Sequence, residues 1–177
     1  MPKSSVKQIE LDEKKILDEL LKNANKSIND IAKTCKFSRQ KVWRVIKNLE
    51  KNKTIWGYTV VIDHQKLAKE RFVMLIKRSN KPLSEKFLDQ IISRDIENIA
   101  KKRGINMINS VYINGVYDWL ISFTANNIQE AKNFVELMNR SYPEIISGID
   151  LLEYMFPVEY DGIINPEVKK LKEFFKL

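Results

Sequence analysis

The chain has 177 residues, of which 44% are hydrophobic, and its formal net charge is +8 at pH 7. This length and apolar content suffice for one domain or two small ones and exclude wholesale disorder. No apolar run approaches the length of a membrane span and no signal peptide precedes the first polar segment, so we expect a cytoplasmic protein with no membrane partner.

The single cysteine and the single histidine limit the chemistry that the chain can carry. Cys35 has no second cysteine with which to form an internal disulfide, and it falls on the apolar side of a predicted helix. His64 lies in a polar stretch. Because a zinc site of the usual type needs several such side chains, we expect no metal, no cofactor and no catalytic residues.

The positive charge is concentrated in the first third of the chain. Residues 1–66 hold 15 of the 31 Lys and Arg residues but only 8 of the 23 Asp and Glu residues, which leaves the remainder almost neutral. A concentrated positive field favours a polyphosphate partner and speeds the encounter with it.

Two helices are predicted before residue 36. Asp12 is placed to cap the first of them, whose apolar stripe comprises Ile16, Leu17, Leu20 and Leu21. Residues 27–35 form the second, because Ser27 and Asp30 match the S-x-x-D form of a capping box.

A third helix follows after a turn of three residues, over residues 38–51. Ser38 is its expected N-cap, and its apolar face contains Val42, Val45, Ile46 and Leu49. Two short helices, a tight turn and a basic second helix are what a helix-turn-helix requires. We expect the DNA-binding residues to be Ser38, Arg39, Gln40, Lys41, Trp43, Arg44, Lys47 and Lys51.

Within that set the residue types predict different contacts. The amide of Gln40 and the guanidinium of Arg44 are suited to base edges, whereas the other cations should mainly meet phosphates. Trp43 is more simply a packing group, with a contact to sugar or to a thymine methyl as the second choice. The alternative for the whole face is a solvated charged surface.

Residues 54–63 favour a strand, which would be the wing of a winged helix or a connecting strand. The pattern then changes. Strands are predicted over residues 71–77, 105–114, 116–124 and 145–156, and helices over residues 83–103 and 127–140. Asn114-Gly115 predicts a tight hairpin turn, and Gly104 is expected just past a helix end.

The element order of this second part is that of a ferredoxin-like βαββαβ domain, so the fold class is α+β. Its two helices can cover only one face of the sheet, and the apolar residues on the other face predict a second copy of the chain. We therefore divide the chain into a winged helix-turn-helix with connecting strand (1–62), a linker (63–70), a ferredoxin-like effector and oligomerisation domain (71–156) and a C-terminal extension with a short helix (157–177).

This arrangement resembles the Lrp/AsnC, or feast/famine, family of transcription regulators over roughly residues 10–156. The matching residues include Ser27, Ser38, the run Ile55-Trp56-Gly57-Tyr58 and Gly115-Val116-Tyr117-Asp118, which is similar to the family's G-x-Y-D turn. The resemblance implies a nucleoid-associated regulator that binds double-stranded DNA as a homodimer, tetramer or octamer and responds to an amino acid.

The resemblance also implies an effector site at Gly115, Tyr117 and Asp118, where a glycine lets a ligand approach the backbone and a carboxylate pairs with an α-ammonium group. Asn114-Gly115 as a plain type I′ turn is the alternative. Asp150 stands where the family usually has threonine, and Val45 where it often has arginine, with Arg44 one place earlier. The operator therefore does not follow by analogy.

Two other functions are compatible with this architecture. Siroheme decarboxylases share it, but such chemistry leans on histidine and arginine in the second domain, and the only histidine here, His64, lies in the linker. An architectural DNA-binding protein without an effector is the other alternative.

Overall fold

The computed structural model describes residues 6–176. Residues Ile62–Pro157 form one compact unit, and the segments before and after it are described by themselves. The predicted α+β class is confirmed, with a helical N-terminal part and a second part built on one sheet.

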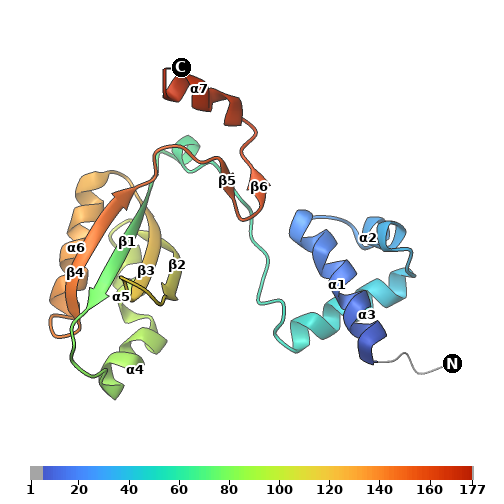
Figure 1. Ribbon diagram of the computed structural model, residues 1–177, viewed down its shortest axis with the longest axis horizontal. Coiled ribbons are helices and arrows are strands. Elements are labelled where there is room, and N and C mark those ends of the chain that lie inside the picture. The colour runs from blue at the N-terminus through green and yellow to red at the C-terminus, as the bar shows by residue number, and fades with distance from the viewer. Residues whose placement is uncertain (1–5, 177) are drawn as a thin grey trace. The chain divides into compact units, whose positions relative to one another are not determined.

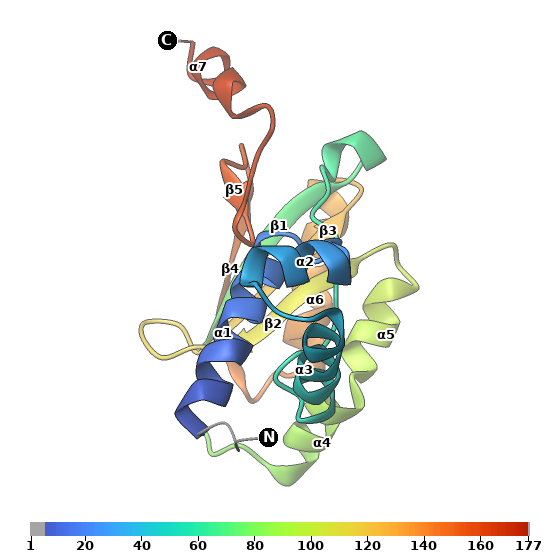
Figure 2. The same ribbon diagram turned by 90° about the vertical axis from the view of Figure 1, so that its right-hand side faces the viewer.

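The N-terminal part contains α1 (Val6–Lys22), α2 (Ile28–Cys35) and α3 (Arg39–Lys51), which Figure 2 shows together. They enclose a small core whose fully buried members are Ile16, Ile31 and Val42. The two predicted caps are confirmed, because the Ser27 hydroxyl accepts the Asp30 N–H and the Ser38 hydroxyl accepts the Lys41 N–H. Between α2 and α3, Lys36 adopts a left-handed φ of 57° that makes the tight turn.

The expected cap at Asp12 is wrong. Helix α1 begins at Val6, because no proline or glycine interrupts residues 6–11, and Asp12 lies inside the helix with only 5% of its surface exposed. The predicted strand over residues 54–63 is also absent from the described chain. A strand needs a neighbour for its backbone hydrogen bonds, and no described segment of the same chain pairs with these residues.

The unit Ile62–Pro157 starts with a 3₁₀ turn, η1 (Gln65–Leu67), and contains four strands and three helices. The strands are β1 (Glu70–Arg78), β2 (Asn106–Tyr112), β3 (Trp119–Ala125) and β4 (Ile146–Glu153), and the helices are α4 (Glu85–Ser93), α5 (Asp95–Lys101) and α6 (Ile128–Ser141). The sheet order is β2-β3-β1-β4, with every neighbour antiparallel, as a ferredoxin-like fold requires.

The helices cover one face of this sheet. Alternate residues of β1, namely Phe72, Met74 and Ile76, are fully buried in a core that also contains Ala100 of α5 and Phe134 of α6. Because side chains alternate across a strand, the residues between them point to the opposite face, which no described helix of this unit covers. Figure 1 shows α4, α5 and α6 beside the sheet.

The single long helix predicted over residues 83–103 is wrong, since Arg94 breaks it with a φ of +58°. Phe87 and Ile96 are both buried, yet nine residues on a continuous helix would place them on opposite sides. Breaking the helix lets both side chains reach the sheet. Ile92 of the same predicted helix is instead 78% exposed.

The hairpin between β2 and β3 exists, but its turn is longer than the expected two-residue turn. The strands end at Tyr112 and restart at Trp119, leaving the loop 113–118, in which Gly115 has a φ of +154°. After the compact unit, β5 (Glu159–Tyr160) pairs with β6 (Ile163–Ile164) in a small hairpin that the sequence did not indicate. A 3₁₀ turn, η2 (Val168–Lys170), and α7 (Leu171–Phe174) follow.

Candidate nucleic-acid interface

Helix α3 presents a continuous polar face. Gln40, Arg44, Lys47 and Lys51 are all exposed, and their spacing of four, three and four residues places them along one side of the helix. At the start of the helix the surface is hollowed. The residues that line this hollow come from the start of α2, from the N-cap of α3 and from α3 itself: Ile28, Ser38, Arg39, Gln40, Lys41, Trp43 and Arg44.

Most of the predicted DNA-binding residues therefore lie around one hollow, but they do not all have free side chains. Ser38 caps the helix through its hydroxyl. Trp43 is 54% exposed, so it is available to a partner and is not a core residue. In residues 6–176, no hydrogen bond or ion pair engages the side chains of Arg39, Gln40 and Arg44.

Lys41 is engaged within the protein. Its Nζ lies 2.5 Å from Oδ2 of Asp12 on α1 and 3.9 Å from the centre of the Phe37 ring. The hydrogen bond from Lys41, aided by one from Gln8, outweighs burial and lowers the pKa of Asp12. Lys41 thus links α3 to α1, and only 32% of its side chain remains exposed.

Lys47 belongs to a second ion pair, at the surface. Its Nζ lies 2.7 Å from Oε2 of Glu50, and the Tyr58 hydroxyl donates to the other oxygen of the same carboxylate at 3.1 Å. These two hydrogen bonds lower the pKa of Glu50. The Lys47 side chain is still 56% exposed, so a phosphate can compete for it.

The sequence analysis missed a buried carboxylate that supports this region. Glu19 of α1 is only 6% exposed and pairs with Lys22 at 2.7 Å and with Lys26, which precedes α2. Its hydrogen bonds to the two lysines lower the pKa of Glu19. Glu19 directly precedes Leu20 of the predicted apolar stripe, and this position was the signal that could have revealed the buried carboxylate.

The predicted effector residues lie in the second unit, around the loop 113–118. The Tyr117 hydroxyl donates to Oδ2 of Asp150 at 2.5 Å, and this hydrogen bond raises the pKa of Tyr117. Lys77, which the sequence analysis did not select, places its Nζ 5.1 Å from the centre of the Tyr117 ring. The sequence held no signal for it, because Lys77 and Asp150 share a face only through the register in which Leu75 pairs with Asp150 across β1 and β4.

Asp118 does not join Tyr117 and Asp150, because its side chain and its backbone N–H are hydrogen-bonded to the backbone of β1. Its Oδ2 accepts the Arg78 N–H at 2.8 Å, while its backbone N–H donates to the Ile76 carbonyl at 2.9 Å. A Cβ built on Gly115 would have no heavy atom within 4 Å, so the loop is open there. The structure brings Tyr117 and Asp150 together and fixes Asp118 against the end of β1.

Three further features of the described residues concern metal, thiol and membrane chemistry. Residues 6–176 hold no group of three or more His, Cys, Asp or Glu side chains placed to bind a metal ion. The Cys35 thiol donates to the Lys15 carbonyl at 3.6 Å, and burial raises its pKa, as expected of an inert packing group. No helix in that range is long and apolar enough to cross a membrane.

Comparison with known proteins agrees with the helix-turn-helix geometry of the N-terminal part. Residues 13–55 match the family model described as winged helix-turn-helix DNA-binding, so the N-terminal part is a DNA-binding domain of that class. No curated protein matches the chain significantly in sequence.

Among solved structures, the AsnC family transcriptional regulator from Agrobacterium tumefaciens is 20% identical with a TM-score of 0.61, covering 84% of this chain and 92% of its own. LrpC of Bacillus subtilis is 17% identical with a TM-score of 0.58, covering 90% and 100%. A Neisseria meningitidis regulator in complex with L-Met is 12% identical with a TM-score of 0.62, covering 87% and 94%.

These likenesses extend over both parts of the chain. The chain is a winged helix-turn-helix protein with a ferredoxin-like second domain. Its fold is that of the Lrp/AsnC regulators, which confirms the family resemblance drawn from the sequence at the level of the fold.

Proposed function

We propose that this protein is a sequence-specific transcription regulator that binds double-stranded DNA as a homodimer or higher oligomer. The observation that supports it best is the exposed face of α3, where Gln40 and Arg44 stand one turn apart and have no partner within residues 6–176. An amide and a guanidinium at this spacing suit the adenine and guanine edges of the major groove.

The ion pairs of this region determine which of the other cations of α3 can contact phosphates. Arg39 and Lys51 are exposed cations suited to phosphates, and Lys47 joins them by exchanging Glu50 for a phosphate. Lys41 acts indirectly, because its ammonium group is held between Asp12 and Phe37. Its role is to hold α3 against α1 at a fixed angle.

Dimer formation is supported by the sheet face that the helices leave uncovered. Val73, Leu75 and Leu120 are half-buried there, and Val111 and Leu152 are 49% and 48% exposed. Partly exposed apolar side chains on an uncovered sheet face are typical of an interface between subunits. A dimer would place two copies of α3 in successive major grooves about 34 Å apart.

We further propose that an amino acid binds beside the loop 113–118. The Neisseria meningitidis regulator, whose fold is similar, was solved as a complex with L-Met, which supports an amino acid as the ligand. Asp150 is exposed and accepts one hydrogen bond, from Tyr117, so its carboxylate can also receive an α-ammonium group. Asp118 shapes the loop, and Gly115 leaves its backbone open to a ligand.

The test is binding of the full chain to random genomic DNA fragments, with the recovered fragments sequenced at several salt concentrations. Enrichment of a near-palindrome with half-sites one helical turn apart is the expected result. Salt-sensitive binding without enrichment would indicate an architectural DNA-binding protein. Absence of binding at physiological salt would reject both and direct attention to a decarboxylase-like activity, for which bound tetrapyrrole is the spectroscopic sign.

A further inference from the structure

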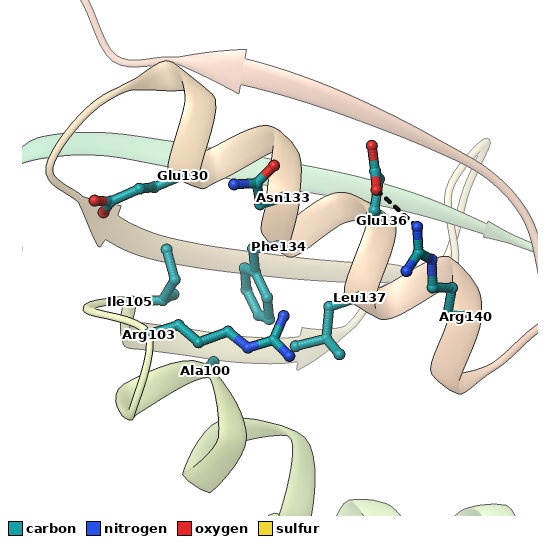
Figure 3. A pocket seen from close by; sticks show the side chains of 9 residues that line it. All are labelled: Ala100, Arg103, Ile105, Glu130, Asn133, Phe134, Glu136, Leu137 and Arg140. Atoms are coloured by element: carbon teal, nitrogen blue, oxygen red, sulfur yellow. Dashed lines mark hydrogen bonds and ion pairs between the residues drawn. The ribbon is translucent and has the colours of Figure 1, made fainter.

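A second candidate ligand site lies on the helix-covered side of the sheet. A pocket of about 500 Å³ opens between α5 and α6, as Figure 3 shows. Its apolar lining comes from Ala100, Ile105, Phe134 and Leu137, of which the first three belong to the buried core. This volume falls in the range of about 300–1,000 Å³ that is usual for small-molecule sites.

The acidic groups in the pocket wall are already engaged. Glu130 accepts two hydrogen bonds from the Asn126 side-chain amide at 2.9 Å and one from the Asn126 backbone N–H at 3.1 Å. These bonds lower the pKa of Glu130. Glu136 pairs with Arg140 at 3.2 Å, as the dashed line in Figure 3 marks. A ligand's ammonium group would have to share each carboxylate with the partner that it already has.

Two donors in the same wall remain available. The Arg103 guanidinium makes no hydrogen bond or ion pair within residues 6–176, and Figure 3 shows its side chain extending along the pocket toward Leu137. Asn133 accepts the Gln129 amide through its Oδ1 at 3.2 Å, which leaves its own amide group as a donor. An uncommitted guanidinium beside apolar side chains matches a carboxylate attached to a hydrocarbon body.

We propose that this pocket binds a small apolar carboxylate that lacks an α-ammonium group, such as a branched-chain or aromatic 2-oxo acid. The carboxylate would meet Arg103 and Asn133, and the hydrocarbon part would contact Phe134 and Leu137. Because this site faces the helices whereas Tyr117 and Asp150 gather at the other face of the sheet, it is distinct from the amino-acid site and does not depend on it.

The experiment is a nitrogen-15 NMR titration of the full chain with 4-methyl-2-oxopentanoate and with phenylpyruvate. Leucine and phenylalanine serve as matched ligands that carry the same skeletons with an ammonium group. We expect saturable shifts of backbone amides in residues 100–105 and α6 for the oxo acids, in the millimolar range for ligands of this size, and much weaker shifts for the amino acids.

Variants separate a specific site from general attraction of anions. Arg103→Gln should weaken oxo-acid binding about tenfold or more, because a charge-assisted hydrogen bond is lost. Lys102→Gln removes the same charge from the exposed neighbour that does not line the pocket, and should leave the affinity unchanged. The proposal is overturned by equal losses in both variants, by equal binding of the amino acids, by shifts confined to residues 113–118, or by no saturable shift with either oxo acid.

Discussion

Asp12 of α1 and Lys41 of α3 form an ion pair with a 2.5 Å Nζ–Oδ2 distance between residues 29 positions apart in the chain. Asp12 is buried, and Lys41 lies two residues before Trp43 and three before Arg44 on the helix proposed to read DNA. The pair therefore couples the stability of the N-terminal domain to the placement of its DNA-contacting side chains.

Removing the charge of Asp12 should destabilise this domain. Asp12→Asn is expected to lower the free energy of unfolding of this domain by about 1–2 kcal/mol, because Lys41 loses its ionic partner. The loss is no larger because the Lys41 ammonium group is partly exposed and water can hydrate it. The measurement is urea unfolding followed through the NMR signals of α3. Asp18→Asn changes an exposed carboxylate of the same helix and should shift the unfolding free energy by less than about 0.5 kcal/mol. Equal effects of the two variants would contradict the coupling.

The same pair gives the domain a dependence on pH. The pKa of Asp12 is lowered in the folded protein, so its stabilising contribution is complete above the unfolded value of about 3.9 and is lost as the pH falls through the lower folded value. The stability difference between the wild type and Asp12→Asn should thus be full near neutral pH and shrink in acid, below about pH 4. A difference that grows in acid would refute this sign.

The two kinds of cation on α3 should behave differently toward DNA. Arg44→Ala is expected to cost about 1–3 kcal/mol on the enriched sequence and to relax its preference, because a base contact is lost. Lys47→Ala should weaken specific and random DNA alike and reduce the salt dependence. Binding isotherms at several salt concentrations distinguish them, with Lys132→Ala on α6 as the charge-matched control. An equal loss on specific and random DNA for Arg44→Ala would remove its assignment to a base edge.

The features that the sequence predicted correctly depend on local signals. The caps at Ser27 and Ser38 involve hydrogen bonds across three residues, and the face that carries Gln40 and Arg44 follows from helical periodicity. The order of strands and helices in the second domain follows from periodicity in the same way. Such signals need no knowledge of the tertiary structure.

The features that it missed depend on contacts between distant segments. The helix break at Arg94 is set by the sheet, which must receive both Phe87 and Ile96. The engagement of Lys41 depends on Asp12, which the local pattern presented as a cap. The segment 54–63 has the composition of a strand, but no strand partner exists for it within the described chain. Local patterns therefore identified which face of α3 is polar but not which of its cations are free.

Dimerisation through the uncovered sheet face should be sensitive to a charge introduced on that face. Leu152 is 48% exposed in the single chain, so Leu152→Glu should fold normally yet weaken self-association by about tenfold or more, because an unpaired carboxylate would be buried in the interface. Light scattering across a dilution series measures the change. Ile92→Glu, at a 78% exposed apolar site on α4, is the matched control. Unchanged self-association of Leu152→Glu would exclude this face as the interface.

Finally, the proposed amino-acid site can be tested through Asp150. An amino acid that binds there should stabilise the wild-type chain by about 2.7 kcal/mol at a hundredfold excess over its dissociation constant, which a thermal-shift screen detects. Asp150→Asn should weaken that ligand by about tenfold or more, since the α-ammonium group loses its charged acceptor. Tyr117→Phe should have a smaller effect, because the Tyr117 hydroxyl only orients Asp150. Glu153→Gln, an exposed change on the same strand, should have none. If Asp150→Asn binds as tightly as the wild type, the ammonium group must be held elsewhere, and a screen in which no amino acid stabilises the chain would contradict the site itself.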